Sequence, residues 1–134
     1  MLVTGDNVVK WVYELSGGAP TASSSALGWM KNNKLIAAMS VEGCNGKNCF
    51  VHLRIEGYAP KEFCFAAVDW VFNQLGCKRM TAPVPRSNAK CLKLLNHIGF
   101  TEEGNLEEAA FDGGDLLMMR LWKKDCYLLN WNKK

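Results

Sequence analysis

The stretch that decides the fold of this chain is Ser87-Asn-Ala-Lys-Cys-Leu-Lys-Leu-Leu-Asn-His-Ile-Gly-Phe-Thr-Glu-Glu-Gly104. Ser87 or Asn88 suits the N-cap of a helix, because a short side-chain oxygen accepts a hydrogen bond from an amide of the first turn. An amphipathic pattern then continues to Gly99, a residue typical of helix ends. The stretch therefore predicts one amphipathic helix that ends at Gly99, and an extended segment that starts at Phe100.

The composition indicates one folded domain of modest charge. The chain has 134 residues, 49% of them hydrophobic and 22% charged, and this length is enough to bury a sizeable core. The net charge of +3 is small for a duplex-DNA binder, so nucleic acid is not an expected partner. No apolar run approaches the ~20 residues of a membrane span, and residues 1–7 do not resemble a signal peptide. We expect one domain over residues 1–134, in a cytoplasm and without a membrane.

The cysteines give no sign of a metal site. There are six, scattered along the chain: Cys44, Cys49, Cys64, Cys77, Cys91 and Cys126. None belongs to a Cys-x-x-Cys pair, and the chain has only two histidines, so a zinc site is not expected. In a cytoplasm the thiols stay reduced, and Cys64 and Cys77 in particular are predicted to lie in the core.

Apolar periodicity and turn residues predict the remaining elements and their order. We expect a helix at 7–15, strands at 26–30, 34–42 and 49–56, a helix at 60–76, a strand at 78–84, the helix described above, an extended segment at 100–110 and a strand at 116–122. The third strand alternates clearly, with Val51, Leu53 and Ile55 on one face and His52, Arg54 and Glu56 on the other. This order predicts an α/β domain with a mixed sheet, helices on its faces and a ligand cleft near the third and fourth strands.

Several short motifs, in this order and spacing, resemble the GNAT family of N-acetyltransferases. They are the Leu-Gly-x-x-Arg-(hydrophobic)-Thr run at 75–81, the Asn88-to-Gly-Phe helix with the Glu-Gly that follows it, and the Asp-Gly-Gly-Asp hairpin at 112–115 before Met-Met-Arg at 118–120. The resemblance is best over residues 50–121 and is closest to small phage-encoded GNAT proteins. It implies a single GNAT-like domain with a mixed, mostly antiparallel central sheet flanked by helices.

The resemblance also implies a reaction and a co-substrate. GNAT proteins bind acetyl-CoA and transfer its acetyl group directly to a primary amine. By this likeness the backbone of Leu53, Arg54 and Ile55 would pair with the pantetheine arm, in a splay between the third and fourth strands. Asn88 would contact the same arm, in addition to capping its helix. The acceptor would be a protein or a small molecule, and members of the family often form homodimers.

The segment expected to hold the pyrophosphate departs from the family pattern. GNAT proteins usually carry Gln/Arg-x-x-Gly-x-Gly/Ala there, whereas residues 57–63 read Gly-Tyr-Ala-Pro-Lys-Glu-Phe. Pro60 has no N–H to donate, Lys61 offers charge in place of the missing glycines, and Glu62 and Phe63 complete the segment. This departure raises an alternative, an inactive GNAT-like module that binds a host or virion protein through an aromatic tail. That tail comprises Trp122, Tyr127 and Trp131.

Amine acetylation needs a base, because a lysine-type amine has a pKa near ~10.4. Glu42, Glu56 and His52 are candidate bases beside the expected cleft; each has a plainer interpretation as a solvated strand-end carboxylate or a structural histidine. Cys91, three residues after Asn88, is a candidate hydrogen-bond donor to the leaving thiolate, or else a small core residue. Asp112 and Asp115 are most simply turn residues.

Overall fold

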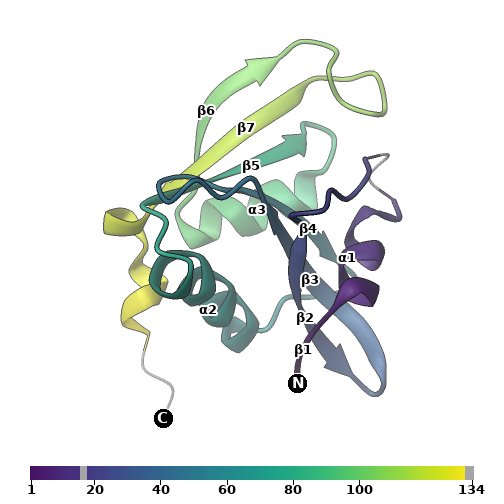
Figure 1. Ribbon diagram of the computed structural model, residues 1–134. Helices are drawn as coiled ribbons and strands as arrows, with labels where there is room; N and C mark the ends of the chain where they lie inside the picture. Colours follow the sequence, from purple (N-terminus) through teal and green to yellow (C-terminus); the bar gives the residue numbers. More distant parts are fainter. Residues whose placement is uncertain (16–17, 132–134) are drawn as a thin grey trace.

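A seven-stranded sheet forms the centre of the computed structural model, which describes residues 1–15 and 18–131 (Figure 1). The spatial order of the strands is β1-β2-β3-β4-β5-β7-β6, and every neighbouring pair is antiparallel except β4 and β5. The strands are β1 (Leu2–Thr4), β2 (Ser25–Lys31), β3 (Lys34–Glu42), β4 (Phe50–Ile55), β5 (Arg79–Pro85), β6 (Thr101–Leu106) and β7 (Leu116–Trp122). The predicted α/β architecture with a mixed, mostly antiparallel sheet is confirmed.

Three α-helices cover the two faces of this sheet. Helix α1 (Asp6–Tyr13) packs on one face against Ala26 and Ala38, through Val8, Val9, Val12 and Tyr13. Helices α2 (Lys61–Asp69) and α3 (Ala89–Ile98) pack on the other face with the larger core cluster, which includes Met39, Val51 and Leu121. The two faces follow from the period of two along each strand, which sends successive side chains to opposite sides.

The turn between β2 and β3 shows how local sequence sets the register. Asn32 and Asn33 both adopt positive φ, 53° and 62°, as the central residues of a two-residue hairpin turn of type I′ require. Asparagine tolerates this conformation better than most residues, which explains why the turn falls at the predicted place. The predicted alternation along β4 is also confirmed, because Val51, Leu53 and Ile55 all contact the larger core cluster.

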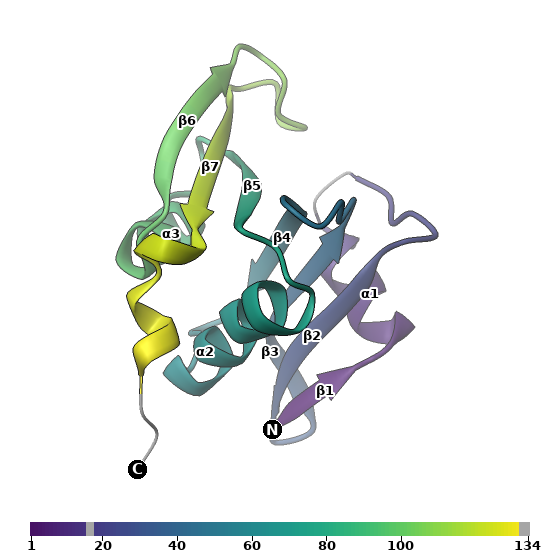
Figure 2. The same cartoon turned by 60° about the vertical axis from the view of Figure 1, so that its left-hand side comes forward.

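The sheet opens between β4 and β5. Only one pair, Phe50 and Thr81, is in parallel register, and beyond it the strands part (Figure 2). The N–H of Thr81 points to β4 and donates to the carbonyl oxygen of Cys49 at 2.9 Å. Backbone direction repeats every two residues, so positions 83 and 85 face β4 in the same way, but both are proline and have no N–H. The ladder therefore cannot continue, and the opening follows from Pro83 and Pro85.

Apart from shifts of one or two residues at element ends, four features differ from the sequence-based predictions or add to them. A short edge strand, β1, precedes α1, and the second helix continues past α2 as a wider π-helical turn, η1 (Trp70–Gln74). Strand β6 stops at Leu106 rather than near residue 110, because a turn begins there in which Glu108 has positive φ. The tail forms two 3₁₀ turns, η2 (Lys123–Asp125) and η3 (Tyr127–Asn130). None of the described helices has the length and apolar character needed to cross a bilayer.

Candidate functional site

A cleft of about 740 Å³ occupies the opening between β4 and β5. Its walls are residues 51–55 of β4 and Glu56 after it, residues 82–85 of β5, the start of α3, the end of α1 and the loop at 109–112. Leu53, Arg54 and Ile55 pair with β3 on one side, through Met39, Ala38 and Ala37. On the β5 side their backbone has no ladder partner among the described residues, so it is available to an extended ligand in the manner of an added strand.

His52 lines the cleft and is hydrogen-bonded to Glu42, which does not itself line the cleft. Nε2 of His52 lies 2.9 Å from Oε1 of Glu42, and the Tyr13 hydroxyl donates to the same oxygen at 3.2 Å. The rings of Tyr13 and His52 are also in contact, with centroids 5.2 Å apart. The pair forms because Ser40 lies opposite His52 in the β3–β4 ladder, and Glu42 is the next residue of β3 on the same face.

This arrangement indicates which ring nitrogen of His52 carries a proton when the ring is neutral. Burial acts to raise the pKa of Glu42, but hydrogen bonds from His52, Tyr13 and Thr21, with the charge of His52, outweigh it and leave the pKa lowered. An ionised carboxylate only accepts hydrogen bonds, so Nε2 carries the proton and Nδ1 is left as the basic nitrogen. Tyr13 has a raised pKa, mainly through burial, and keeps its proton. The sequence analysis assigned Tyr13 no role at the site.

Asn88 and Cys91 lie together at the start of α3, where both line the cleft. Asn88 Oδ1 accepts a hydrogen bond from the Cys91 amide at 3.2 Å, so Asn88 is the N-cap of the helix. The cap uses the carbonyl oxygen of the side chain and leaves the Nδ2 amide as a donor. Burial raises the pKa of Cys91 to about 11, so its thiol is protonated at neutral pH. It is therefore both a buried residue and a neutral donor at the cleft.

Glu56 is already bound to a neighbour. Nε and Nη2 of Arg54 both donate to its Oε1, at 3.1 and 2.7 Å, and this pairing lowers the pKa of Glu56. Arg54 is held in turn by a hydrogen bond to the Trp11 carbonyl oxygen at 2.8 Å and by stacking 4.1 Å from the Trp11 ring centroid. The geometry favours His52 over Glu56 as a proton acceptor.

A second pocket, of about 560 Å³, continues from the cleft and shares Ile55 and Lys90 with it. The loop at 57–59 forms one wall, and α3 forms the other with Lys90, Lys93 and His97. These three residues have spacing i, i+3 and i+7, which places them on one face of the helix. This spacing can be recognised in the sequence, but the sequence-based prediction placed the pyrophosphate site at residues 57–63 instead.

The side chains of residues 61–63 do not reach either of these two cavities. The Lys61 ammonium lies 5.5 Å from the centroid of the Trp131 ring, and Phe63 is buried in the core. Glu62 lines a different pocket, of about 570 Å³, between β1, β2 and α2. These residues can contribute to an anion site only through the backbone amides at the beginning of α2.

The remaining sequence candidates pack within the domain. Asp112 accepts a hydrogen bond from Ser87, which lowers its pKa, and Asp115 accepts from the Glu108 amide, so both serve their loop as expected. The aromatic tail is similarly engaged. Trp131 contacts the Phe65 ring, Tyr127 donates to the His97 carbonyl oxygen at 2.6 Å, and Arg79 and Lys124 lie over the Trp122 ring.

Solved structures to which this chain is similar include N-acetyltransferases. The chain is similar to mutant forms of the spermidine/spermine N-acetyltransferase SpeG from Vibrio cholerae, with TM-score 0.76 and 17% identity over 98% of this chain and 99% of that one. It is also similar to the N-acetyltransferase PseH from Campylobacter jejuni in complex with acetyl coenzyme A, with TM-score 0.61 and 17% identity over 86% and 77%. No protein-family model and no curated protein sequence matches the chain. The fold is therefore the GNAT fold that the sequence motifs predict.

Proposed function

We propose that this chain is an N-acetyltransferase that moves the acetyl group of acetyl-CoA directly to a primary amine. The observation that carries the proposal is the cleft between β4 and β5. Among the described residues, the β4 backbone from Leu53 to Ile55 has no ladder partner on the β5 side, and His52, hydrogen-bonded to Glu42, lies on the cleft wall. A fold shared with an N-acetyltransferase whose structure contains acetyl coenzyme A supports the same conclusion.

The residues of the cleft fit the co-substrate at both of its ends. The amide and carbonyl groups of Leu53 to Ile55 suit the pantetheine arm, which has amides of its own. Lys90 and Lys93 supply positive charge to the second pocket, where the pyrophosphate would lie. Their charge takes the place of the loop glycines that this chain lacks. Acetyl-CoA would bring an activated thioester, and the protein positions it beside the acceptor.

The chemistry assigned to the side chains is proton transfer and polarisation. His52 Nδ1 takes a proton from the acceptor, directly or through water, so that the neutral amine attacks the thioester carbon, while Glu42 holds the ring and stabilises the imidazolium. The Nδ2 amide of Asn88 is placed to donate a hydrogen bond to the arm or to the thioester oxygen. The Cys91 thiol, neutral because it is buried, donates to the departing sulfur.

The acceptor enters from the side of the cleft formed by α1 and the loop at 109–112. Phe111, 79% exposed, lies on that wall and offers an apolar surface to an acceptor. We propose a small polyamine or an accessible amine of a protein, with spermidine as the first compound to try, because a structural neighbour is named for that substrate. A cytoplasmic setting belongs to the same proposal.

The direct test is calorimetric titration of the full chain with acetyl-CoA, with CoA as a control. Micromolar binding is expected, followed by release of free CoA when an amine panel that begins with spermidine is added. No binding at millimolar acetyl-CoA would overturn the proposal and favour the protein-binding alternative. Binding without CoA release for any amine would retain the co-substrate site and reject the proposed acceptors.

A further inference from the structure

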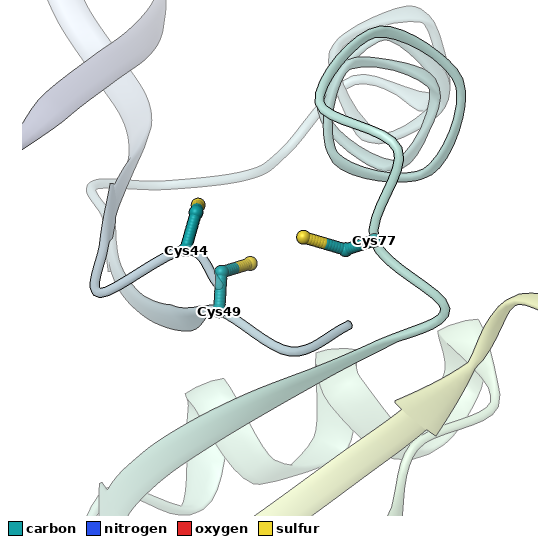
Figure 3. A group of neighbouring side chains, drawn as sticks. All are labelled: Cys44, Cys49 and Cys77. Carbon is teal, nitrogen blue, oxygen red and sulfur yellow. The ribbon is translucent and has the colours of Figure 1, made fainter. Parts of the chain in front are cut away.

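Three cysteine side chains lie close together beside the N-terminal ends of β4 and β5, where these two strands still pair (Figure 3). Cys44 and Cys49 belong to the loop between β3 and β4, and Cys77 belongs to the turn before β5. The three Sγ atoms all lie within 4.8 Å of one another. Cys49 and Cys77 are buried and Cys44 is exposed, so the group is closed by protein on one side and reaches solvent on the other.

The backbone holds these thiols in place independently of any bond between them. Gly43 and Gly76 directly precede Cys44 and Cys77 and have φ of +63° and +75°, a conformation that side chains other than glycine rarely adopt. The Lys47 carbonyl oxygen accepts hydrogen bonds from the amides of residues 78 and 79, at 2.8 and 3.0 Å. The loop and the turn are thus tied together beside the cluster, which leaves the three sulfurs preorganised.

The number and kind of donors favour a metal ion over a disulfide. A disulfide would join two of the sulfurs and leave the third without a function, whereas a metal ion uses all three. A zinc–sulfur bond of about 2.3 Å places tetrahedral thiolates ~3.8 Å apart, so sulfurs within 4.8 Å need to move by only ~1 Å.

We propose that Cys44, Cys49 and Cys77 bind one thiophilic metal ion, with zinc as the expected occupant. Three thiolates form the site, and the fourth position faces solvent beside Cys44, where water completes a tetrahedron. No histidine or carboxylate joins the group within residues 1–15 and 18–131. The ion would join the β3–β4 loop to the turn before β5. The spacing of the cysteines along the chain does not indicate this site, because the fold brings Cys77 to the other two.

The proposal stands independently of acetyl transfer, and zinc uptake tests it. The full chain, freed of metal under reducing conditions, is titrated with Zn²⁺ and then with Co²⁺, whose thiolate charge-transfer absorption reports sulfur ligation. We expect one ion per chain, and a loss of zinc affinity on the order of 100-fold in Cys44→Ser. Cys64→Ala, which removes a buried thiol of α2 outside the cluster, should bind zinc like the original chain.

Folding of the variants is checked through the midpoint of thermal unfolding without metal. Cys44 is exposed, so Cys44→Ser should match the metal-free original chain. Zinc should then raise the midpoint of the original chain and of Cys64→Ala, but not that of Cys44→Ser. Absence of zinc uptake by the original chain, or equal zinc affinity in Cys44→Ser, would overturn the proposal. Uptake of Cu⁺ by the three thiols without measurable zinc affinity would overturn the assignment to zinc.

Discussion

At the scale of single residues, hydrogen bonding distinguishes two of the three candidate bases, because Glu42 holds His52 at the cleft whereas Arg54 engages Glu56. His52→Gln should lower kcat on the order of 100-fold, because a general base typically contributes that much or more. Glutamine still donates to Glu42, so the fold and acetyl-CoA affinity should change little. Glu56→Gln is the matched variant, and since Arg54 already engages Glu56, kcat should fall by less than about threefold. Steady-state kinetics with one amine compare them; the reverse order of effects would make Glu56 the base.

The lowered pKa of Glu42 also leads to a prediction of how the free energy of unfolding depends on pH. Its pKa is lowered in the folded chain, net of the burial that acts to raise it. The stability that results is present at pH above the unfolded-state pKa of about 4.3 and is lost as pH falls through the folded-state value. Glu42→Gln should therefore be less stable than the original chain at pH 7, and the difference should shrink at pH 3. Urea unfolding at the two pH values measures this, and an unchanged difference would contradict it.

At the scale of elements, the proposal assigns pyrophosphate binding to the lysines on one face of α3, in place of the loop glycines that the chain lacks. The double variant Lys90→Gln, Lys93→Gln should lower the affinity for both acetyl-CoA and CoA on the order of tenfold, because two charges beside the pyrophosphate are lost. The loss should be smaller at high salt. Lys123→Gln, Lys124→Gln removes the same charge from the η2 turn and should bind normally. Calorimetric titration measures the affinity of both double variants. An equal loss of affinity in the two would mean that net charge, and not the position of Lys90 and Lys93, causes the effect.

At the scale of the whole molecule, a ligand in the β4–β5 opening bridges the two parts of the sheet. Acetyl-CoA at 100 times its Kd should add about 2.7 kcal/mol to the free energy of unfolding by mass action. For a domain of this size that corresponds to a rise in Tm on the order of 10 °C. A thermal scan over a series of acetyl-CoA concentrations measures the shift. A Tm independent of concentration would mean that the folded chain has no such site.

Local sequence was sufficient for most of the elements. Apolar periodicity and turn residues predicted the three helices and most of the sheet strands, because spacing, N-cap chemistry at Asn88 and the turn at Asn32 and Asn33 act over a few residues. The short edge strand β1 was missed and the tail received no prediction of secondary structure, since Leu2–Thr4 and residues 123–130 take their conformation from packing partners elsewhere in the chain.

By itself, the sequence determined the order of elements and the two faces of each strand, and it placed at 83 and 85 two prolines that have no N–H. That these positions face β4, where the sheet opens, depends on the pairing of β5 with β7. Only the tertiary structure decided which side chains meet. Glu42 reaches His52 through the register of β3 against β4, Lys90 and Lys93 face the 57–59 loop through the packing of α3, and Cys77 joins Cys44 and Cys49 across a loop and a turn. Such contacts depend on long-range pairing, which residue spacing along the chain does not record.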